Sequence, residues 1–122
     1  MINDSENQLH QVEISIENAE KAIELAKALK RLHDNADFKT VILEDFFHEE
    51  AHRAVLLKAD EAMAPPEKQK QVDDVITTIG GLYNYFGKIY QMANMSARAL
   101  AAHQETREEI LEEQLSEGIA VQ

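Results

Sequence analysis

The chain contains no cysteine and no tryptophan, and only four glycines and two prolines occur among its 122 residues. The absence of cysteine excludes a disulfide framework, a zinc knuckle and a thiol nucleophile. So few glycines and prolines cannot supply the turns of a β-sandwich, a β-barrel or repeated βαβ units. No apolar run approaches the roughly 20 residues that span a bilayer, and the first ten residues lack the basic region and apolar core of a signal peptide. These absences predict an intracellular, all-α protein.

Basic residues are also scarce: Lys and Arg number 12 and Asp and Glu number 23, which gives a formal net charge of −11. Proteins that bind nucleic acids gain affinity when Lys and Arg release counterions from the phosphate backbone, so we expect no direct binding to nucleic acid. The same reasoning argues against a membrane surface as a partner. The acidity either keeps a small helical protein soluble or presents an acidic face to a basic partner, as a DNA mimic does.

Residues 5–33 have the spacing of an amphipathic helix. Apolar side chains recur at alternating steps of three and four residues, which places them on one helical face. The residues in this stripe are Leu9, Val12, Ile16, Ala19, Ile23 and Ala26, and the stripe is widened toward its end by Leu25, Leu29 and Leu32.

Residues 37–63 form a second predicted helix, with Asp37 at its N-cap. Val41-Ile42-Leu43 resembles a strand, but its acidic neighbours and the length of the segment favour a helix. Proline disfavours helical geometry in the residue before it, so Pro65-Pro66 is expected to end this helix. The side chains that we expect to face the core are Phe38, Val41, Ile42, Phe46, Val55, Leu56 and Ala59.

The third predicted helix is long and spans 66–116, with Pro66 in its first turn. It carries a seven-residue repeat, which is typical of a coiled-coil seam. Gly80-Gly81 interrupts the seam, and glycine inside a helix costs about 1 kcal/mol relative to alanine. The pair therefore marks either a kink or a place where another helix comes close. Gly118 is expected to stop the helix and to leave 118–122 as a tail.

The sequence therefore predicts one all-α domain over 1–122, a three-helix arrangement with a long C-terminal helix and coiled-coil-like packing. Two shorter helices cannot cover the whole third helix, so its seam is expected to join copies of the chain in a homo-oligomer. The predicted interface residues are Ile76, Ile79, Tyr83, Phe86, Tyr90, Ala93, Ala97 and Leu100.

One motif has the form of a catalytic site: residues 48–52 match the H-E-x-x-H pattern of zinc metalloproteases. Two histidines four residues apart share a helix face and can bind zinc, while the glutamate can activate water. A third ligand would have to come from elsewhere in the chain, and the candidates are Asp73, Asp74 and His103. Charged Glu50 and Arg53 do not suit the buried helix of such enzymes, and no edge strand is evident to hold a peptide. We therefore interpret His48 and His52 as surface residues and predict neither a metal nor another cofactor.

The chain resembles a group of small acidic helical proteins encoded by tailed bacteriophages. The likeness runs from Phe38 through Phe86 and returns near the C-terminus, and the motifs that carry it are VILEDFF, RAVLLKADEAM, PEKQ, IGGLYNYF and TREEIL. The resemblance implies a phage origin and a part in the virion or its assembly. None of these motifs is catalytic, and the resemblance assigns no functional residue.

We therefore expect a non-enzymatic structural or assembly protein of a tailed phage, located in the host cytoplasm during infection or in the virion. It would act through helix-mediated association with itself and with other phage structural proteins of the virion, portal, tail or capsid. Two alternatives stay open. One is a small acidic inhibitor or DNA mimic that binds a host protein. The other is a metalloprotein built on His48, Glu49 and His52.

Overall fold

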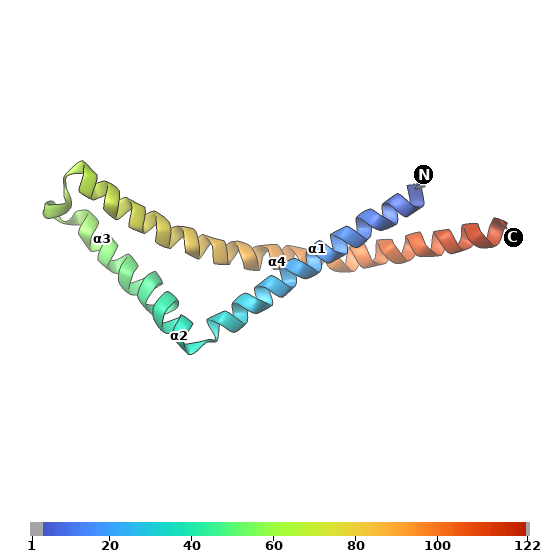
Figure 1. Ribbon diagram of the computed structural model, residues 1–122, viewed down its shortest axis with the longest axis horizontal. Coiled ribbons are helices and arrows are strands. Elements are labelled where there is room, and N and C mark those ends of the chain that lie inside the picture. Colours follow the sequence, from blue (N-terminus) through green and yellow to red (C-terminus); the bar gives the residue numbers. More distant parts are fainter. Residues whose placement is uncertain (1–3, 122) are drawn as a thin grey trace. The chain divides into compact units, whose positions relative to one another are not determined.

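The computed structural model describes the backbone of residues 4–121 and the side chains of residues 4–118. Three long helical stretches make up this part of the chain, and it contains no strand (Figure 1). The elements are α1 (Asp4–His33), α2 (Ala36–Phe38), the π-helix η1 (Lys39–Glu50), α3 (Ala51–Ala59), the 3₁₀-helix η2 (Glu61–Met63) and α4 (Pro66–Val121). The predicted all-α fold with a long C-terminal helix is confirmed. No helix among these residues is long and apolar enough to cross a bilayer.

The residues group into two compact units, where the sequence predicts one domain. Unit 1 consists of Met1–Ala26 and Ile89–Gln122, and unit 2 of Lys27–Lys88. Both α1 and α4 contribute to each unit, because the boundaries fall inside these two helices.

Unit 1 is an antiparallel pair formed by the first part of α1 and the second part of α4. The blue start of α1 and the red end of α4 lie at the same end of this pair (Figure 1). Residues early in α1 share a groove with 114–118, whereas residues slightly later share one with 106–113. The contact is made by apolar side chains that are buried on both helices, namely Val12, Ile16, Ala19, Ala26, Ile89, Ala93 and Ile110.

The predicted stripe of α1 is confirmed, since its members are buried or half-buried at every position from Leu9 to Ala26. Of the three leucines expected to widen the stripe, Leu29 is buried, but Leu25 and Leu32 are exposed. An alternating spacing of three and four residues fits one neighbouring helix, so side chains away from that narrow contact stay in water.

The seam of α4 has the predicted seven-residue repeat, but two of the eight predicted positions, Tyr83 and Ala97, are exposed. Ile79, Phe86, Ala93 and Leu100 lie in the seam as predicted. Two residues that directly precede predicted positions also pack in the seam, namely Ile89 before half-buried Tyr90 and Ser96 before exposed Ala97, and His103 and Ile110 continue the repeat. In a seven-residue repeat, steps of three then four residues and steps of four then three residues are both possible. The side on which the neighbouring helix lies decides which of two adjacent residues enters the seam.

Gly118 was expected to end α4, and Gly80-Gly81 was expected to mark either a kink or the close approach of another helix, but neither glycine signal interrupts the helix. The helix runs without interruption through Gly80-Gly81 and past Gly118 to Val121, and no described glycine has a positive φ. The expected end at Ser116 and the tail over 118–121 are therefore wrong, and Gln122 lies outside the described residues. Glycine is only a weak helix breaker, and neighbours with high helix propensity keep the backbone helical.

The second predicted helix is continuous from α2 through η1 to α3, but its middle part is wound as a π-helix. It begins after Asn35 rather than Asp37, because the Asn35 side chain accepts a hydrogen bond of 3.0 Å from the backbone N–H of Phe38. It ends at Ala59 rather than Met63. Asp60 takes an extended conformation there, and its carboxylate caps η2 by accepting from Ala62 N at 2.9 Å.

The π winding changes which side chains face inward. Phe38, Ile42 and Phe46 are half-buried as predicted, but the inner face is completed by Leu43, Phe47 and Ala54. Four residues that were expected in the core are exposed instead: Val41, Val55, Leu56 and Ala59. A π-helix bonds residue i to i+5, so residues four and five apart share a face, whereas the predictions assumed a period of 3.6.

Candidate protein-interaction site

Six of the seven aromatic residues of the chain belong to unit 2. Phe86 lies at the centre of their cluster, with ring centroids 5.5 Å from His33 and 5.9 Å from both Phe38 and Phe47. These separations lie within the range in which aromatic pairs attract each other. The aromatic cluster consists of Phe38, Phe46, Phe47, Tyr83, Tyr85, Phe86 and the imidazole of His33.

The cluster joins all three helical stretches of unit 2. His33 is the last residue of α1, Phe38 and Phe47 come from the segment α2–η1, and Phe86 comes from α4. The Nζ of Lys58 lies 2.5 Å from a carboxylate oxygen of Asp73. Together with the ring contacts of Phe47 and Phe38, this ion pair shows that the segment from α2 to α3 runs antiparallel to the first part of α4. The sequence places the aromatic residues on one side because steps of four and five between Phe38, Leu43 and Phe47 match the π winding of η1.

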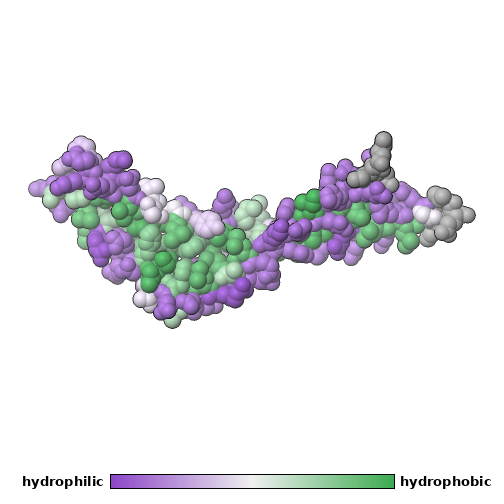
Figure 2. Space-filling model, in the orientation of Figure 1, coloured by the Kyte–Doolittle hydropathy of each residue, from purple (hydrophilic) through white to green (hydrophobic). Residues whose placement is uncertain are grey.

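An open cleft of about 460 Å³ lies beside the aromatic cluster. Its volume is in the range of about 300–1,000 Å³ that is typical of ligand sites, and such sites are mostly apolar. Figure 2 shows hydrophobic residues gathered on unit 2 in this view. The cleft is lined by His33, Leu43, Phe47, His48, Ile79, Gly80 and Tyr83.

Tyr83 stands at the rim of this cleft and is largely uncovered. Its ring lies edge-on to Phe47, with a centroid distance of 5.5 Å, yet 64% of the residue is exposed. Tyrosine is enriched at protein interfaces because it offers a large apolar area with a polar end. An exposed tyrosine beside an apolar cleft is therefore typical of a protein-binding surface.

Gly80 forms part of the cleft wall and leaves open space there. A Cβ atom placed on Gly80 would meet no other atom within 4 Å, and the same holds for Gly81 and Gly87. All three glycines are helical without a positive φ. Neither the backbone conformation nor internal packing of unit 2 therefore requires glycine at these positions.

The eight predicted interface residues divide into two groups. Ile79 and Ala93 are buried within the single chain, and Ile76, Phe86, Tyr90 and Leu100 are half-buried there. Only Tyr83 and Ala97 are exposed. The chain itself thus covers most of the seam, and Tyr83 at the rim of the cleft is the large seam residue that remains exposed.

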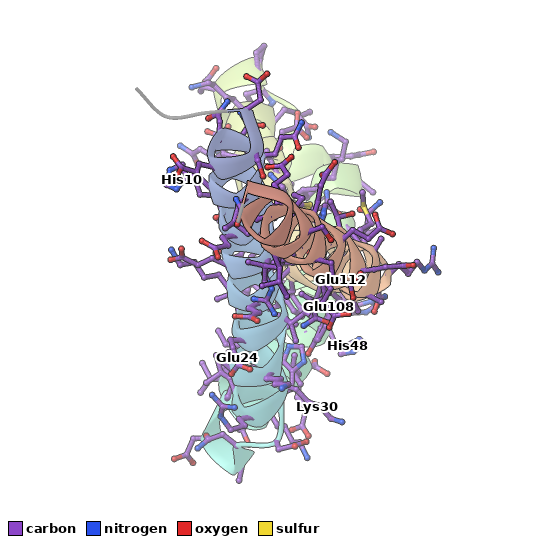
Figure 3. The ribbon with its side chains drawn as sticks, turned by 90° about the vertical axis from the view of Figure 1, so that its right-hand side faces the viewer. His10, Glu24, Lys30, His48, Glu108 and Glu112 are labelled. Atoms are coloured by element: carbon purple, nitrogen blue, oxygen red, sulfur yellow. The ribbon has the colours of Figure 1, made fainter. Side chains whose placement is uncertain are left out.

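The H-E-x-x-H residues are divided between two kinds of helix, because His48 lies in η1 and His52 in α3. Both histidines are exposed, and Figure 3 shows the His48 side chain projecting outward. Among the suggested third ligands, Asp73 is bound to Lys58. Within the part of the chain that the structure describes, no three His, Cys, Asp or Glu side chains form a group that could hold a metal ion.

The net charge is concentrated in unit 1. Twelve Asp and Glu residues against three Lys and Arg give unit 1 a formal charge of −9, whereas eleven against nine give unit 2 only −2. Glu108 and Glu112 lie on one face of α4, four residues apart (Figure 3). A groove of about 640 Å³ along the helix pair is lined by Glu6, Glu13 and Glu117 among others. The acidic character of the chain is therefore mainly a property of its helix pair, a division that the net charge of the whole sequence does not reveal.

No family model, no curated protein and no solved structure matches the chain. The likeness to tailed-phage proteins therefore stays a prediction from the sequence motifs. What the molecule does has to be inferred from its own residues, and the feature that they define best is the aromatic-lined cleft of unit 2.

Proposed function

We propose that this chain is a non-enzymatic helical protein that works by binding other protein chains through the cleft of unit 2. The observation that carries the proposal is the cleft itself, where exposed Tyr83 stands beside Phe47, Leu43 and Gly80. Aromatic anchors next to a pocket are the residues that dominate binding energy at protein interfaces. The surface of the cleft is mostly apolar, so binding explains its residues better than catalysis does.

Self-association fits the charge distribution. Two copies that met through unit 1 would bring formal charges of −9 together, whereas contact through unit 2 involves only −2 on each side. Like charges oppose association over about one Debye length, which is roughly 8 Å at physiological salt. A homo-oligomer built on unit 2 avoids most of this repulsion.

The phage context is part of the same proposal. Four of the five motifs that resemble tailed-phage proteins lie within unit 2, at 41–47, 53–63, 66–69 and 79–86. These segments include the cleft residues Leu43, Phe47, Gly80 and Tyr83. Because the resemblance coincides with the cleft, it supports a role as a phage structural or assembly protein in the virion, portal, tail or capsid.

Light scattering coupled to size-exclusion chromatography tests the association. Wild-type protein should give a mass above the monomer value of 13.8 kDa that rises with concentration. Tyr83→Ser should shift the mass toward the monomer, while Tyr85→Ser, at a similarly exposed position outside the cleft lining, should not. A monomer at every concentration would contradict self-association. Mass spectrometry of purified particles of the encoding phage would then decide between a virion component and a factor left in the host cell.

A second function is favoured by the charge of unit 1. A helix pair with a formal charge of −9 is suited to bind a basic protein, which is the behaviour of an acidic inhibitor or DNA mimic. Such a complex should form at low salt and weaken steeply as salt is added, because added ions screen exposed charges. A pull-down from host lysate at low salt that returned no basic protein would remove this alternative.

A further inference from the structure

We infer that one flank of α4 is a self-complementary surface, on which Tyr83 of one copy packs against Gly80 of a second copy, and Ile76 against Gly87. This inference rests on the proposed self-association and specifies its geometry. The four residues follow one another at steps of four, three and four, which places them within about 60° of each other on the helix. The flank therefore alternates large, small, large and small side chains along one line.

The two glycines are costly for the helix and have no internal use. Glycine lowers helix stability relative to alanine, and α4 contains Gly80 and Gly87 well inside its 56 residues. Nothing lies within 4 Å of a Cβ atom at either position, so no neighbour in the same chain demands the missing side chain. A second helix that approaches closely is the remaining structural use for two glycines one heptad apart.

The large residues of the flank fit the same arrangement. Tyr83 is exposed and Ile76 is half-buried, so both retain surface that a partner can cover. When two copies of the flank run antiparallel about a two-fold axis between residues 81 and 82, the residue numbers of facing positions sum to 163. Tyr83 then faces Gly80, and Ile76 faces Gly87, on both sides of the axis. A two-fold contact needs this reciprocity, in which residue i of one copy meets j of the other and j meets i.

A second copy suits this surface better than a partner of different chemistry. The flank itself carries no charged residue, and unit 2 as a whole is close to neutral. A strongly acidic or basic partner would find no matching charge there, whereas an identical flank supplies a side chain for each hollow. The cleft of about 460 Å³ beside Gly80 gives the incoming tyrosine ring room to enter.

Alanine substitutions separate a binding role of the glycines from a structural role within the chain. If the glycines serve binding, alanine should raise the melting temperature of the dissociated protein, whereas if the fold of the single chain needs them, alanine should lower it. In Gly80→Ala/Gly87→Ala, the melting temperature of the dilute, dissociated protein should rise, since alanine favours the helix and has free space. The dissociation constant of the dimer, measured by sedimentation over a dilution series, should increase about tenfold or more, because the added methyl groups hold the helices apart. Gly81→Ala is the matched control: it has the same open surroundings but lies on another side of α4. It should raise the melting temperature without changing the dissociation constant.

The absence of cysteine allows a direct test of the pairing. Protein with Tyr83→Cys mixed with protein with Gly80→Cys should form the mixed disulfide faster than either variant forms a disulfide with itself. A dimer that is as tight in Gly80→Ala/Gly87→Ala as in wild type would overturn the inference and leave the proposed self-association standing on another surface. Wild-type protein that stayed monomeric would overturn both, and the cleft would then be assigned to a different protein or to a small apolar molecule.

Discussion

Phe47 of η1 meets Tyr83 of α4 edge to face, with ring planes at 82° and centroids 5.5 Å apart. This contact joins the π-helical segment to the long helix at the edge of the cleft. An edge-to-face pair adds about 0.5–1.5 kcal/mol beyond the area that it buries. It also holds Tyr83 at the rim of the cleft while leaving most of its surface to solvent.

Phe86 should be the residue on which unit 2 depends most. Its ring touches rings from α1, α2 and η1, so Phe86→Ala removes contacts with three elements at once. We expect a loss of about 3 kcal/mol in the free energy of unfolding, toward the low end for such changes because the ring is half-buried. Urea denaturation followed by circular dichroism measures this. Tyr85→Ala, whose ring centroid lies 6.3 Å from that of Phe86, should cost much less.

The π winding of η1 predicts that Leu43 matters and Val41 does not. Leu43 is half-buried in the cleft wall, whereas 59% of Val41 is exposed. Leu43→Ala should lower the free energy of unfolding by about 2 kcal/mol, and Val41→Ala should change it by less than about 0.5 kcal/mol. Thermal denaturation of the two variants side by side is the measurement. The reverse order would mean that the segment is wound as an ordinary α-helix.

The start of the second helical stretch depends on Asn35. Its side chain accepts from the N–H of Phe38 at 3.0 Å, so Asn35→Ala leaves that donor without its cap and should cost about 1 kcal/mol. Asp37, which the sequence alone suggests as the cap, lies inside the helix. Asp37→Ala should therefore have an effect within about 0.5 kcal/mol. Equal losses in the two variants, measured by chemical denaturation, would argue against this assignment.

The acidity of unit 1 should weaken it at low salt. Glu108 and Glu112 are like charges four residues apart on one helix face (Figure 3), and such pairs cost about 0.2–0.5 kcal/mol. Glu108→Gln/Glu112→Gln should raise the melting temperature in dilute buffer. Near 1 M salt, where the Debye length falls to about 3 Å, the difference from wild type should vanish. A difference that persisted at high salt would show that repulsion is not its cause.

The cleft of unit 2 could be predicted from the sequence only in part. Clustered aromatic residues and the pair Gly80-Gly81 mark the right part of α4, and Tyr83 stands among the predicted interface residues. Leu43 and Phe47 were missed, because their inward placement depends on the i to i+5 bonding of η1. The pattern of apolar residues for an α-helix points instead to Val41, Val55 and Leu56, which are exposed.

Local sequence determined the class of fold and the course of the longest helices. A regular spacing of three and four residues is a property of the chain alone, so the stripe of α1 and the seven-residue repeat of α4 were readable without any partner helix. The scarcity of proline and glycine was also visible in the sequence alone, and it excludes β-sheet folds that need many turns.

Tertiary structure alone decided the phase of the α4 seam, the winding of η1 and the division of charge between the two units. Each depends on which helix lies beside which, and neighbouring residues such as Ile89 and Tyr90 serve a seam equally well until a partner selects one. Contacts between residues far apart in the chain make that selection, and no local pattern contains them.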